Sequence, residues 1–270
     1  MANKETELKP ARWRKLRTVP GVIGMTILTT LVGAGITWIV SDLKEANFRP
    51  SDAIKLSVET DPAKMSKPQV RYWSAVIPST VRTHGSPFKD GGCMGFHSWV
   101  ADNHGTDAGT TVLQISAQGA TDKAVLVQNM RVDIIETSPP LTGIGVECPT
   151  AGNAQLREIA VNLDATPPTV DYTSDSNAPF GFTLAKGETE SFVVSATAAK
   201  ATYRWRIEFD VVVNGIADTL EVGGKDGFTT TVKPHKAWSW NYVDGWQLND
   251  PDSSAIQPTI PASEPLPQIS

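Results

Sequence analysis

Apolar and polar residues alternate with a period of two over much of this chain, the pattern of a β-strand with one buried face. The longest example runs from Tyr203 to Asn214, where aromatic and aliphatic residues alternate mainly with charged ones. Asn214-Gly215 is typical of a tight hairpin turn, and Ala217 to Val222 is expected to return as the partner strand. The pattern predicts an antiparallel sheet over a hydrophobic core.

Shorter alternations predict further strands, and their apolar positions are Ile54, Leu56 and Val58; Leu113, Ile115 and Ala117; Ile159, Val161 and Leu163; and Phe192, Val194 and Ala196. Within residues 124–137 the apolar phase shifts near Gln128 and Asn129, and a β-bulge would reconcile the two halves. No long helical pattern interrupts this series. We therefore expect a mainly β, antiparallel, immunoglobulin-like β-sandwich of roughly seven to ten strands over residues 54–246.

The pattern is different at residues 21–40, GVIGMTILTTLVGAGITWIV, which contain no charged residue. A helix of this length spans about 30 Å, the thickness of the hydrocarbon core of a bilayer. Residues 19–41 are therefore predicted to form one N-terminal transmembrane helix. The alternative is a cleaved signal peptide with Val32-Gly33-Ala34 as its cleavage site, although the apolar run continues to Val40.

Charge predicts the orientation of this helix. Residues 1–18 contain six basic and two acidic residues, whereas residues 41–270 contain 18 basic and 27 acidic ones. Because the basic flank of a membrane helix stays in the cytoplasm, we expect residues 1–18 to be a cytoplasmic tail and the C-terminal domain to be extracellular. A domain this acidic is unsuited to nucleic acid, which requires clustered basic residues.

Three further features concern the organisation of the chain. Residues 42–53 are expected to be a stalk between the membrane and the sandwich. Residues 247–270 are rich in proline and poor in large apolar residues, so we expect a disordered tail. In the membrane helix, small residues recur at every fourth position, a stripe through which two copies would pair as a homodimer: Thr29, Gly33 and Thr37.

Four blocks resemble core segments of uncharacterised exported proteins of actinomycete-type bacteria: AVLVQNMRVDIIETSPP, GIGVEC, REIAVNLDATPP and YRWRIEFDV. The likeness covers residues 90–230, and the layout of a basic tail, one membrane helix and a β-rich domain is similar too. The resemblance implies an architecture and a location in the bacterial cell envelope. It implies no activity and no site residues.

The segment HGSPFKDGGCMGFHSW, residues 84–99, places Cys93 between His84 and His97. A cysteine nucleophile needs a base beside it, so one interpretation is a cell-wall-acting cysteine hydrolase or transferase. The flanking residues Gly91–Gly95 depart from the serine- and arginine-containing block of L,D-transpeptidases.

The other interpretation of Cys93 is a disulfide with Cys148, because the chain has two cysteines and the expected topology places both outside the cell. We predict this bond, with both cysteines at strand ends. An immunoglobulin pair would show a tryptophan well beyond the first cysteine, but Trp99 follows Cys93 by six residues. The bond is therefore expected to attach a loop to the sandwich rather than to join the two sheets.

Two other groups carry possible chemistry. Trp238, Trp240, Tyr242 and Trp246 form an aromatic segment that is either a binding patch or a strand held on the sandwich by its own rings. Four polar residues of one stretch have the side chains of metal ligands but match no usual ligand spacing, so we expect no metal site and no cofactor: His97, Asp102, His104 and Asp107.

These observations favour a membrane-anchored, extracytoplasmic binding or scaffolding protein without catalytic activity, whose partner is an envelope protein or a wall glycan. Two alternatives remain. The first is the cysteine enzyme centred on Cys93 with His84 or His97. The second is an accessory subunit of a membrane receptor complex.

Overall fold

The computed structural model describes residues 48–65, 72–84, 93–149, 157–172, 180–241, 245–255, 258–261 and 264–267. The chain divides into two compact units, Met1–Phe48 and Arg49–Ser270, and the description below concerns the second. Among the described residues, no helix is long and apolar enough to cross a membrane. The predicted cytoplasmic tail, transmembrane helix and homodimer stripe (Thr29, Gly33 and Thr37) lie outside the described residues.

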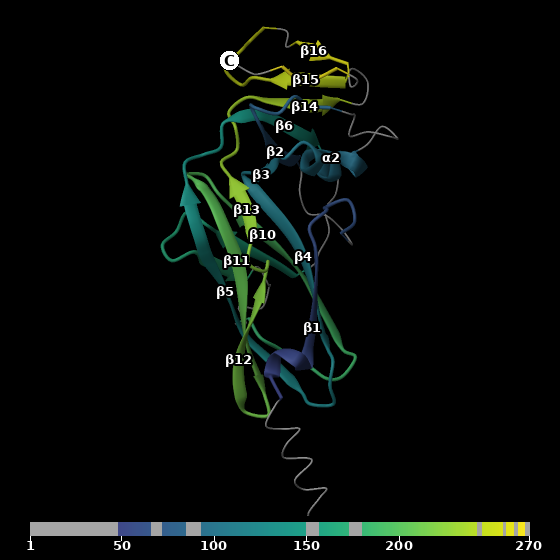
Figure 1. Ribbon diagram of the computed structural model, residues 1–270, viewed down its shortest axis with the longest axis vertical. Helices are drawn as coiled ribbons and strands as arrows, with labels where there is room; N and C mark the ends of the chain where they lie inside the picture. Colours follow the sequence, from purple (N-terminus) through teal and green to yellow (C-terminus); the bar gives the residue numbers. More distant parts are fainter. Residues whose placement is uncertain are drawn as a thin grey trace, which may run out of the picture. The chain divides into compact units, whose positions relative to one another are not determined.

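The second unit is mainly β, as the alternation predicts. Five strands form one sheet in the order β1-β4-β10-β7-β8. Three of them, β1, β4 and β10, are labelled in Figure 1. Neighbouring strands of this sheet are antiparallel except β10 and β7, which run parallel. The strands are β1 (Ile54–Glu59), β4 (Thr110–Gly119), β10 (Thr189–Thr197), β7 (Arg157–Asn162) and β8 (Thr169–Tyr172).

A second sheet contains eleven strands in the order β16-β15-β14-β6-β2-β3-β13-β11-β5-β9, with β12 beside β11. Its first half, from β16 to β3, and its second half, from β13 to β9, are connected through a parallel pairing of β3 with β13. The strands are β2 (Tyr72–Pro78), β3 (Thr106–Ala108), β5 (Val125–Ser138), β6 (Gly143–Pro149), β9 (Phe182–Leu184), β11 (Thr202–Val213), β12 (Ile216–Val222), β13 (Phe228–Thr231), β14 (Ala237–Asn241), β15 (Gly245–Asn249) and β16 (Thr259–Ile260).

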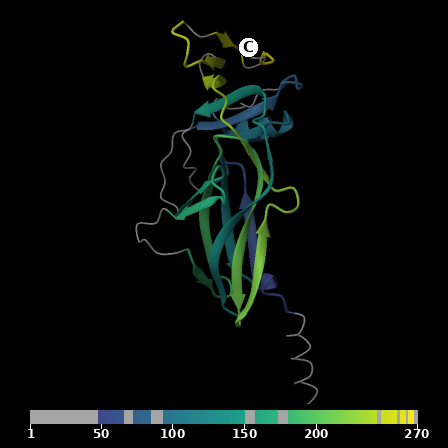
Figure 2. The same cartoon turned by 90° about the vertical axis from the view of Figure 1, so that its left-hand side faces the viewer.

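The two sheets contact each other through phenylalanine rings. The ring centroid of Phe192 on β10 lies 5.7 Å from that of Phe209 on β11. Phe180 contacts both rings, with centroid distances of 5.8 Å to Phe192 and 6.0 Å to Phe209. Phe192 and Phe209 occupy apolar positions of their alternations, so the period of two directs both rings into the layer between the sheets. Figure 2 shows the long strands of the unit turned by 90° from Figure 1.

Strand β11 confirms the predicted alternation. Every second residue from Tyr203 to Val213 is buried, whereas Arg204 and Arg206 are only partly covered. Arg204 pairs with Glu136 across the neighbouring strand at 2.8 Å, so the outer face of the sheet carries charged pairs. The apolar set of the strand thus faces the core and the charged set faces outward.

The predicted hairpin and bulge are also present. Asn214 and Gly215 have positive φ angles of 52° and 78°, which a two-residue turn of this kind requires. In the pairing of β11 with β5, the register shifts so that Gln128 is the extra residue between Val127 and Asn129. The phase shift read from the sequence is therefore a β-bulge.

The last residues of the predicted stalk, 50–53, are part of the folded unit. The short 3₁₀ helix η1 (Pro50–Ala53) buries Pro50 and Ala53. Its Ser51 N–H donates a hydrogen bond to Asp218 of β12 at 3.2 Å, and the Ala53 carbonyl accepts one from the Ala120 N–H at 2.8 Å. Residues 50–53 therefore belong to the folded unit.

The predicted disordered tail is wrong for the described residues after 246. Strand β15 continues to Asn249 and pairs with β16, and the Leu266 side chain is only 6% exposed. The Leu266 N–H donates a buried hydrogen bond to Thr83 Oγ1 at 2.7 Å. This segment is anchored by a few apolar residues that lie between prolines. Their spacing matches neither the period of a strand nor that of a helix, so the sequence pattern did not predict the attachment. The described residues contain sixteen strands rather than roughly seven to ten, partly for this reason.

Candidate functional site

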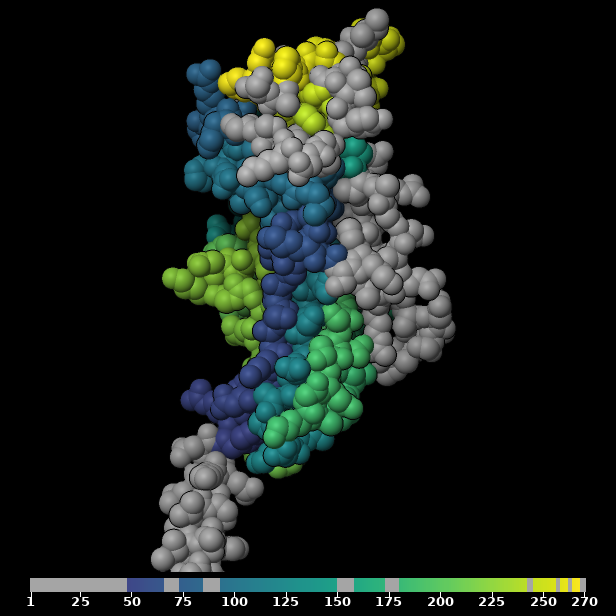
Figure 3. All heavy atoms as spheres, turned by 90° about the vertical axis from the view of Figure 1, so that its right-hand side faces the viewer, coloured from purple at the N-terminus to yellow at the C-terminus, as the bar shows by residue number. Residues whose placement is uncertain are grey.

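The segment around Cys93 and the aromatic segment that contains Trp238, Trp240 and Trp246 come together at one end of the unit. This end is here called the distal region. It consists of η2 (Cys93–Gly95), α2 (Phe96–Asp102), β2, β3, β6 and β14–β16. Figure 1 shows it at the end opposite η1 and the β11–β12 hairpin, and Figure 3 shows the C-terminal residues in yellow above the blue residues of β2 and α2. Its core joins Phe96, Trp99 and Cys148 to the C-terminal tryptophans.

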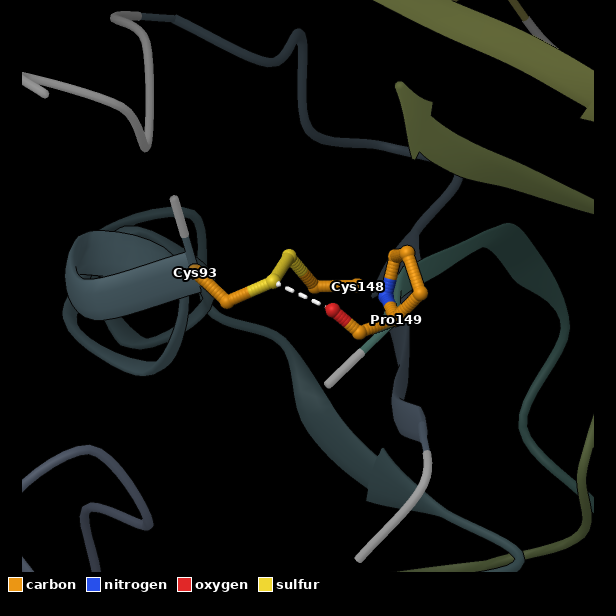
Figure 4. Close-up of a disulfide and its surroundings, with 3 residues drawn as sticks. All are labelled: Cys93, Cys148 and Pro149. Atoms are coloured by element: carbon orange, nitrogen blue, oxygen red, sulfur yellow. Dashed lines mark hydrogen bonds between the residues drawn. A yellow bond between two sulfur atoms is a disulfide. The ribbon is translucent and has the colours of Figure 1, made fainter. Parts of the chain in front are cut away.

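The predicted disulfide is confirmed: Cys93 and Cys148 are bonded, with their Cα atoms 5.9 Å apart (Figure 4). Cys148 is fully buried near the end of β6, as expected for a strand end. Cys93 instead begins η2, so the strand-end prediction is wrong for this residue. The Pro149 carbonyl oxygen lies 3.1 Å from Cys93 Sγ. This is a van der Waals contact and not a hydrogen bond, because the sulfur is part of the disulfide and carries no proton. The bond fixes η2, and α2 after it, to β6.

The same bond removes the basis of the cysteine-enzyme interpretation, since neither cysteine is a free thiol. The two histidines proposed as the base, His84 and His97, also lie in different elements: His84 precedes η2, and His97 is part of α2. The His84 side chain is exposed, and its backbone holds the end of α2: its N–H donates to Asn103 Oδ1 at 3.0 Å and its carbonyl accepts from Trp99 Nε1 at 2.9 Å. His97 lies in the first turn of α2. His84 thus has a structural role, since its backbone groups hold the C-terminal end of α2.

The three described tryptophans of the aromatic segment are buried and do not form an exposed binding patch. Trp238, Trp240 and Trp246 are 3%, 9% and 1% exposed, and Tyr242 lies outside the described residues. The Trp246 ring contacts those of Trp240 and Trp99 at centroid distances of 5.5 Å and 5.4 Å. The rings therefore attach β14 and β15 to α2, which agrees with the alternative that the segment is held by its own side chains.

The four polar residues of the 97–107 stretch separate into two pairs. Asp102 and His104 are exposed, whereas His97 and Asp107 line one cavity between α2, β2 and the start of β4. The cavity has a volume of about 20 Å³, enough for about one water molecule. Within the described part of the chain, no group of three or more histidine, cysteine or acidic side chains is arranged to hold a metal ion.

Asp107 is the most unusual titratable group of the distal region. Burial raises the pKa of its carboxyl above the ordinary value of 3.8, and the charge of His97 and a hydrogen bond from Thr111 offset part of this rise. The Thr111 hydroxyl lies 2.7 Å from Thr230 Oγ1, which accepts a hydrogen bond from Trp205 Nε1 at 2.9 Å. A chain of polar contacts therefore connects Asp107 with the core of the two-sheet layer.

A second, open pocket lies on another part of the distal region. It has a volume of about 340 Å³ and lies between the ends of β6 and β15 and the segment before β14, with Glu147, Lys233, Pro234, His235, Ala237, Asn249 and Pro251 lining it. Glu147 is 3% exposed, and its carboxylate pairs with Lys233 Nζ at 2.8 Å. This volume is at the lower end of the range for small-molecule pockets.

Sequence reasoning missed this pocket because its residues come from three distant segments. The only local sign is Glu147, a charged residue inside the apolar run Ile144–Cys148. A charge in such a run indicates a buried ion pair, but it does not identify Lys233 as the partner.

No protein-family model, no curated protein and no solved structure matches this chain.

Proposed function

We propose that this chain is a non-catalytic binding or scaffolding protein of the cell envelope, anchored by one transmembrane helix over residues 19–41, with its β unit outside the cell. The observation that carries the proposal is the Cys93–Cys148 disulfide. A disulfide supports a location in an oxidising compartment, where such bonds persist, and this one uses both sulfurs for structure. The uncharged run and its basic flank support the anchor and its orientation. The resemblance to exported actinomycete-type proteins agrees with this location.

The finer fold that we propose is an immunoglobulin-like sandwich to which the distal region is added. Constant-type immunoglobulin domains have strands A, B, E and D in one sheet and C, F and G in the other. The order β1-β4-β10-β7 corresponds to A-B-E-D, and β12-β11-β5 corresponds to G-F-C. The parallel pairing of β7 with β10 departs from that pattern.

A second feature that supports this fold is the corner between β10 and β11. Many such domains have a tyrosine near the start of strand F whose hydroxyl bonds back across the corner. Here Tyr203 OH donates to Asp164 Oδ1 at 2.9 Å, and the same carboxylate accepts hydrogen bonds from the N–H groups of Ala199 and Lys200 at 2.8 and 3.0 Å. Asp164 thus connects the tyrosine to the backbone of the corner.

We infer that the distal region carries the binding face. The unit is entered at η1, beside β12, while the distal region lies at its other end and contains the open pocket with Glu147 and Lys233. Membrane proteins that bind partners outside the cell gain reach when the binding face is far from the entry of the chain. The disulfide and the buried tryptophans hold this region rigid, which lowers the entropic cost of binding.

Photo-crosslinking of the full chain in its membrane tests the proposal. A photoreactive amino acid replaces Met94 in the distal region, which is 70% exposed, or Ile216 at the β11–β12 hairpin, which is 51% exposed. Both are exposed apolar residues, so Ile216 is a matched control. We expect a discrete adduct with an envelope protein or a wall glycan from position 94 and none from position 216.

Adducts from position 216 alone would place the binding face at the wrong end, and no adduct from either position would contradict the binding proposal. Thiol alkylation of the unreduced, folded chain tests the enzyme alternative independently. Two reactive thiols would restore Cys93 as a nucleophile; we expect none.

A further inference from the structure

The outer face of the sheet formed by β5, β11 and β12 changes in character along its length. Residues that are paired across antiparallel strands point to the same face, so the register divides this face into rows. In three rows an arginine pairs with the acidic residue directly opposite it: Arg204 with Glu136, Arg206 with Asp133 and Arg131 with Glu208. These rows are charged and suited to contact with water.

The last row of the same face is apolar. Leu126 of β5 lies opposite Val212 of β11, which lies opposite Ala217 of β12. Leu126 and Ala217 are exposed, and Ile216, which begins β12 directly after the turn, is exposed too. We call these four residues the apolar end. It leaves apolar side chains in contact with water on a face whose other rows are polar or charged.

The apolar end lies beside the point at which the chain enters the folded unit. The Ser51 N–H of η1 donates a hydrogen bond to Asp218 at 3.2 Å, and Asp218 is two residues from Ile216, about 7 Å along the strand. Figure 1 shows η1 in purple beside this end of β12, opposite the distal region. The entry of the chain and the apolar end therefore share one end of the unit.

The chain before this point limits how far the apolar end can lie from a bilayer. The proposed transmembrane helix ends at residue 41, and the folded unit begins at Arg49. Even fully extended, the connection over residues 42–48 spans no more than about 30 Å. The apolar end therefore stays within reach of the lipid surface if the chain is anchored as proposed.

Two acidic residues near the apolar end have partners. Asp218 accepts hydrogen bonds from the N–H groups of Ser51 and Thr219, at 3.2 and 2.9 Å. In the neighbouring turns, Asp122 pairs with Lys186 at 2.9 Å. These partners offset negative charge that would otherwise oppose contact with anionic lipid head groups.

We propose that the apolar end rests on the outer leaflet of the membrane that anchors the chain, and that this contact holds the distal region away from the lipid. The inference deepens the proposed function and rests on it, because it needs the anchor. Leu126 and Ile216 leave water when they enter the boundary between head groups and acyl chains, and this burial favours the contact. The area is small, but the short connection to the anchor makes the contact intramolecular, so a weak interaction is sufficient.

Photo-crosslinking to lipid tests the contact directly. The full chain is placed in vesicles of phosphatidylcholine and phosphatidylglycerol, with a photoreactive amino acid at Leu126 or at Leu141. Leu126 is 37% exposed at the start of β5, whereas Leu141 is 40% exposed beyond its other end, so Leu141 is a matched control. We expect lipid adducts from position 126 and none above background from position 141.

A second measurement tests the two large side chains of the apolar end. The photoreactive amino acid is placed at Ala217, and Leu126→Ser is combined with Ile216→Ser. Removing both apolar side chains from the lipid interface should lower the yield of lipid adducts about tenfold. Leu141→Ser is the control and should leave the yield unchanged. The substituted side chains are exposed in the folded unit, so the melting temperatures should stay within about 2 °C of the wild type.

The outcomes separate this contact from the anchor itself. If the chain stays in the vesicles in alkaline carbonate but positions 126 and 141 label lipid equally, the contact is wrong and the anchor stands. If position 126 labels a second copy of the chain instead of lipid, the apolar end is an interface between copies and the inference is overturned. An unchanged yield in the double serine variant would overturn it as well. Extraction of the chain by carbonate would overturn the anchor and the contact together.

Discussion

The region of the two packed sheets and the distal region form their cores in different ways. In the sheets, long strands such as β11 bury every second residue, and rings such as Phe192 and Phe209 meet because each follows its own alternation. In the distal region the strands are short, and the core combines Trp73, Trp99 and Trp246 with a disulfide. A small region that lacks long strands thus relies on large rings and a covalent bond.

The difference separates two sources of stability. The core of the two sheets results from many similar residues spread over several strands. The distal region depends on a few contacts between segments that are more than a hundred residues apart, such as Trp99 with Trp246. Substitutions in the first should lower the stability of the whole unit, whereas substitutions in the second should first release local segments.

The largest expected effect is in β11. Trp205 is fully buried and its Nε1 donates to Thr230, so Trp205→Ala should lower the free energy of unfolding by about 3–5 kcal/mol. Its neighbour Arg204 makes an exposed ion pair with Glu136, and Arg204→Ala should cost about 0–1 kcal/mol. Urea unfolding of the full chain measures both. Equal losses would contradict the assignment of the two faces.

Removal of the disulfide should have the next largest effect. Replacing both Cys93 and Cys148 with alanine frees a loop of 55 residues, which the loop-entropy model values at about 4 kcal/mol before any relaxation. We expect hydrogen exchange to increase first in α2 and β6, and to change least in β11. A uniform increase over the whole unit would show that the distal region is not a separate source of stability.

Leu266 tests the attachment of the C-terminal segment. Its side chain is buried in the distal core, so Leu266→Ala should cost about 2–3 kcal/mol in unfolding free energy. Glu264, two residues earlier and exposed, is the control, and Glu264→Ala should change stability by less than about 0.5 kcal/mol. If the two variants unfold alike, the prediction of a disordered tail made from the sequence is restored.

The smallest expected effect is at the corner between β10 and β11. Asp164→Ala removes the acceptor of three hydrogen bonds, those from Ala199, Lys200 and Tyr203, and should cost about 1–2 kcal/mol. Tyr203→Phe removes one of them and should cost less, about 1 kcal/mol. Thermal unfolding compares the two variants. A larger loss in Tyr203→Phe would show that the ring hydroxyl, rather than the bonds to the backbone, stabilises the corner.

Much of the secondary structure could be predicted from the sequence because its signals are local. The alternation in β11, the turn at Asn214-Gly215 and the bulge at Gln128 each depend on neighbouring residues, and each is present. The disulfide followed from a count, since a chain with two cysteines offers one intramolecular pair. The short helix α2 was not predicted, because seven residues are too few for a helical period to be distinct.

The candidate site was harder to predict because its residues are neighbours only in the folded chain. The sequence places His97, Asp102, His104 and Asp107 together, yet the structure brings only His97 and Asp107 to one cavity. The aromatic segment likewise had two interpretations, and contact of Trp246 with Trp99 decides between them. Neither arrangement has a signal in the spacing of the residues along the chain.

The sequence by itself determined the strands with a clear alternation, such as β11, the apolar face of each of these strands, and which cysteines can pair. These properties depend on side-chain period, turn chemistry and composition, all of which are local. The tertiary structure alone decided the order of the strands, the burial of the tryptophans and of Leu266, and the placement of His97 and Asp107 at one cavity. These depend on which distant surfaces fit together, because the free energy of burial has no preference for particular partners until whole faces are matched.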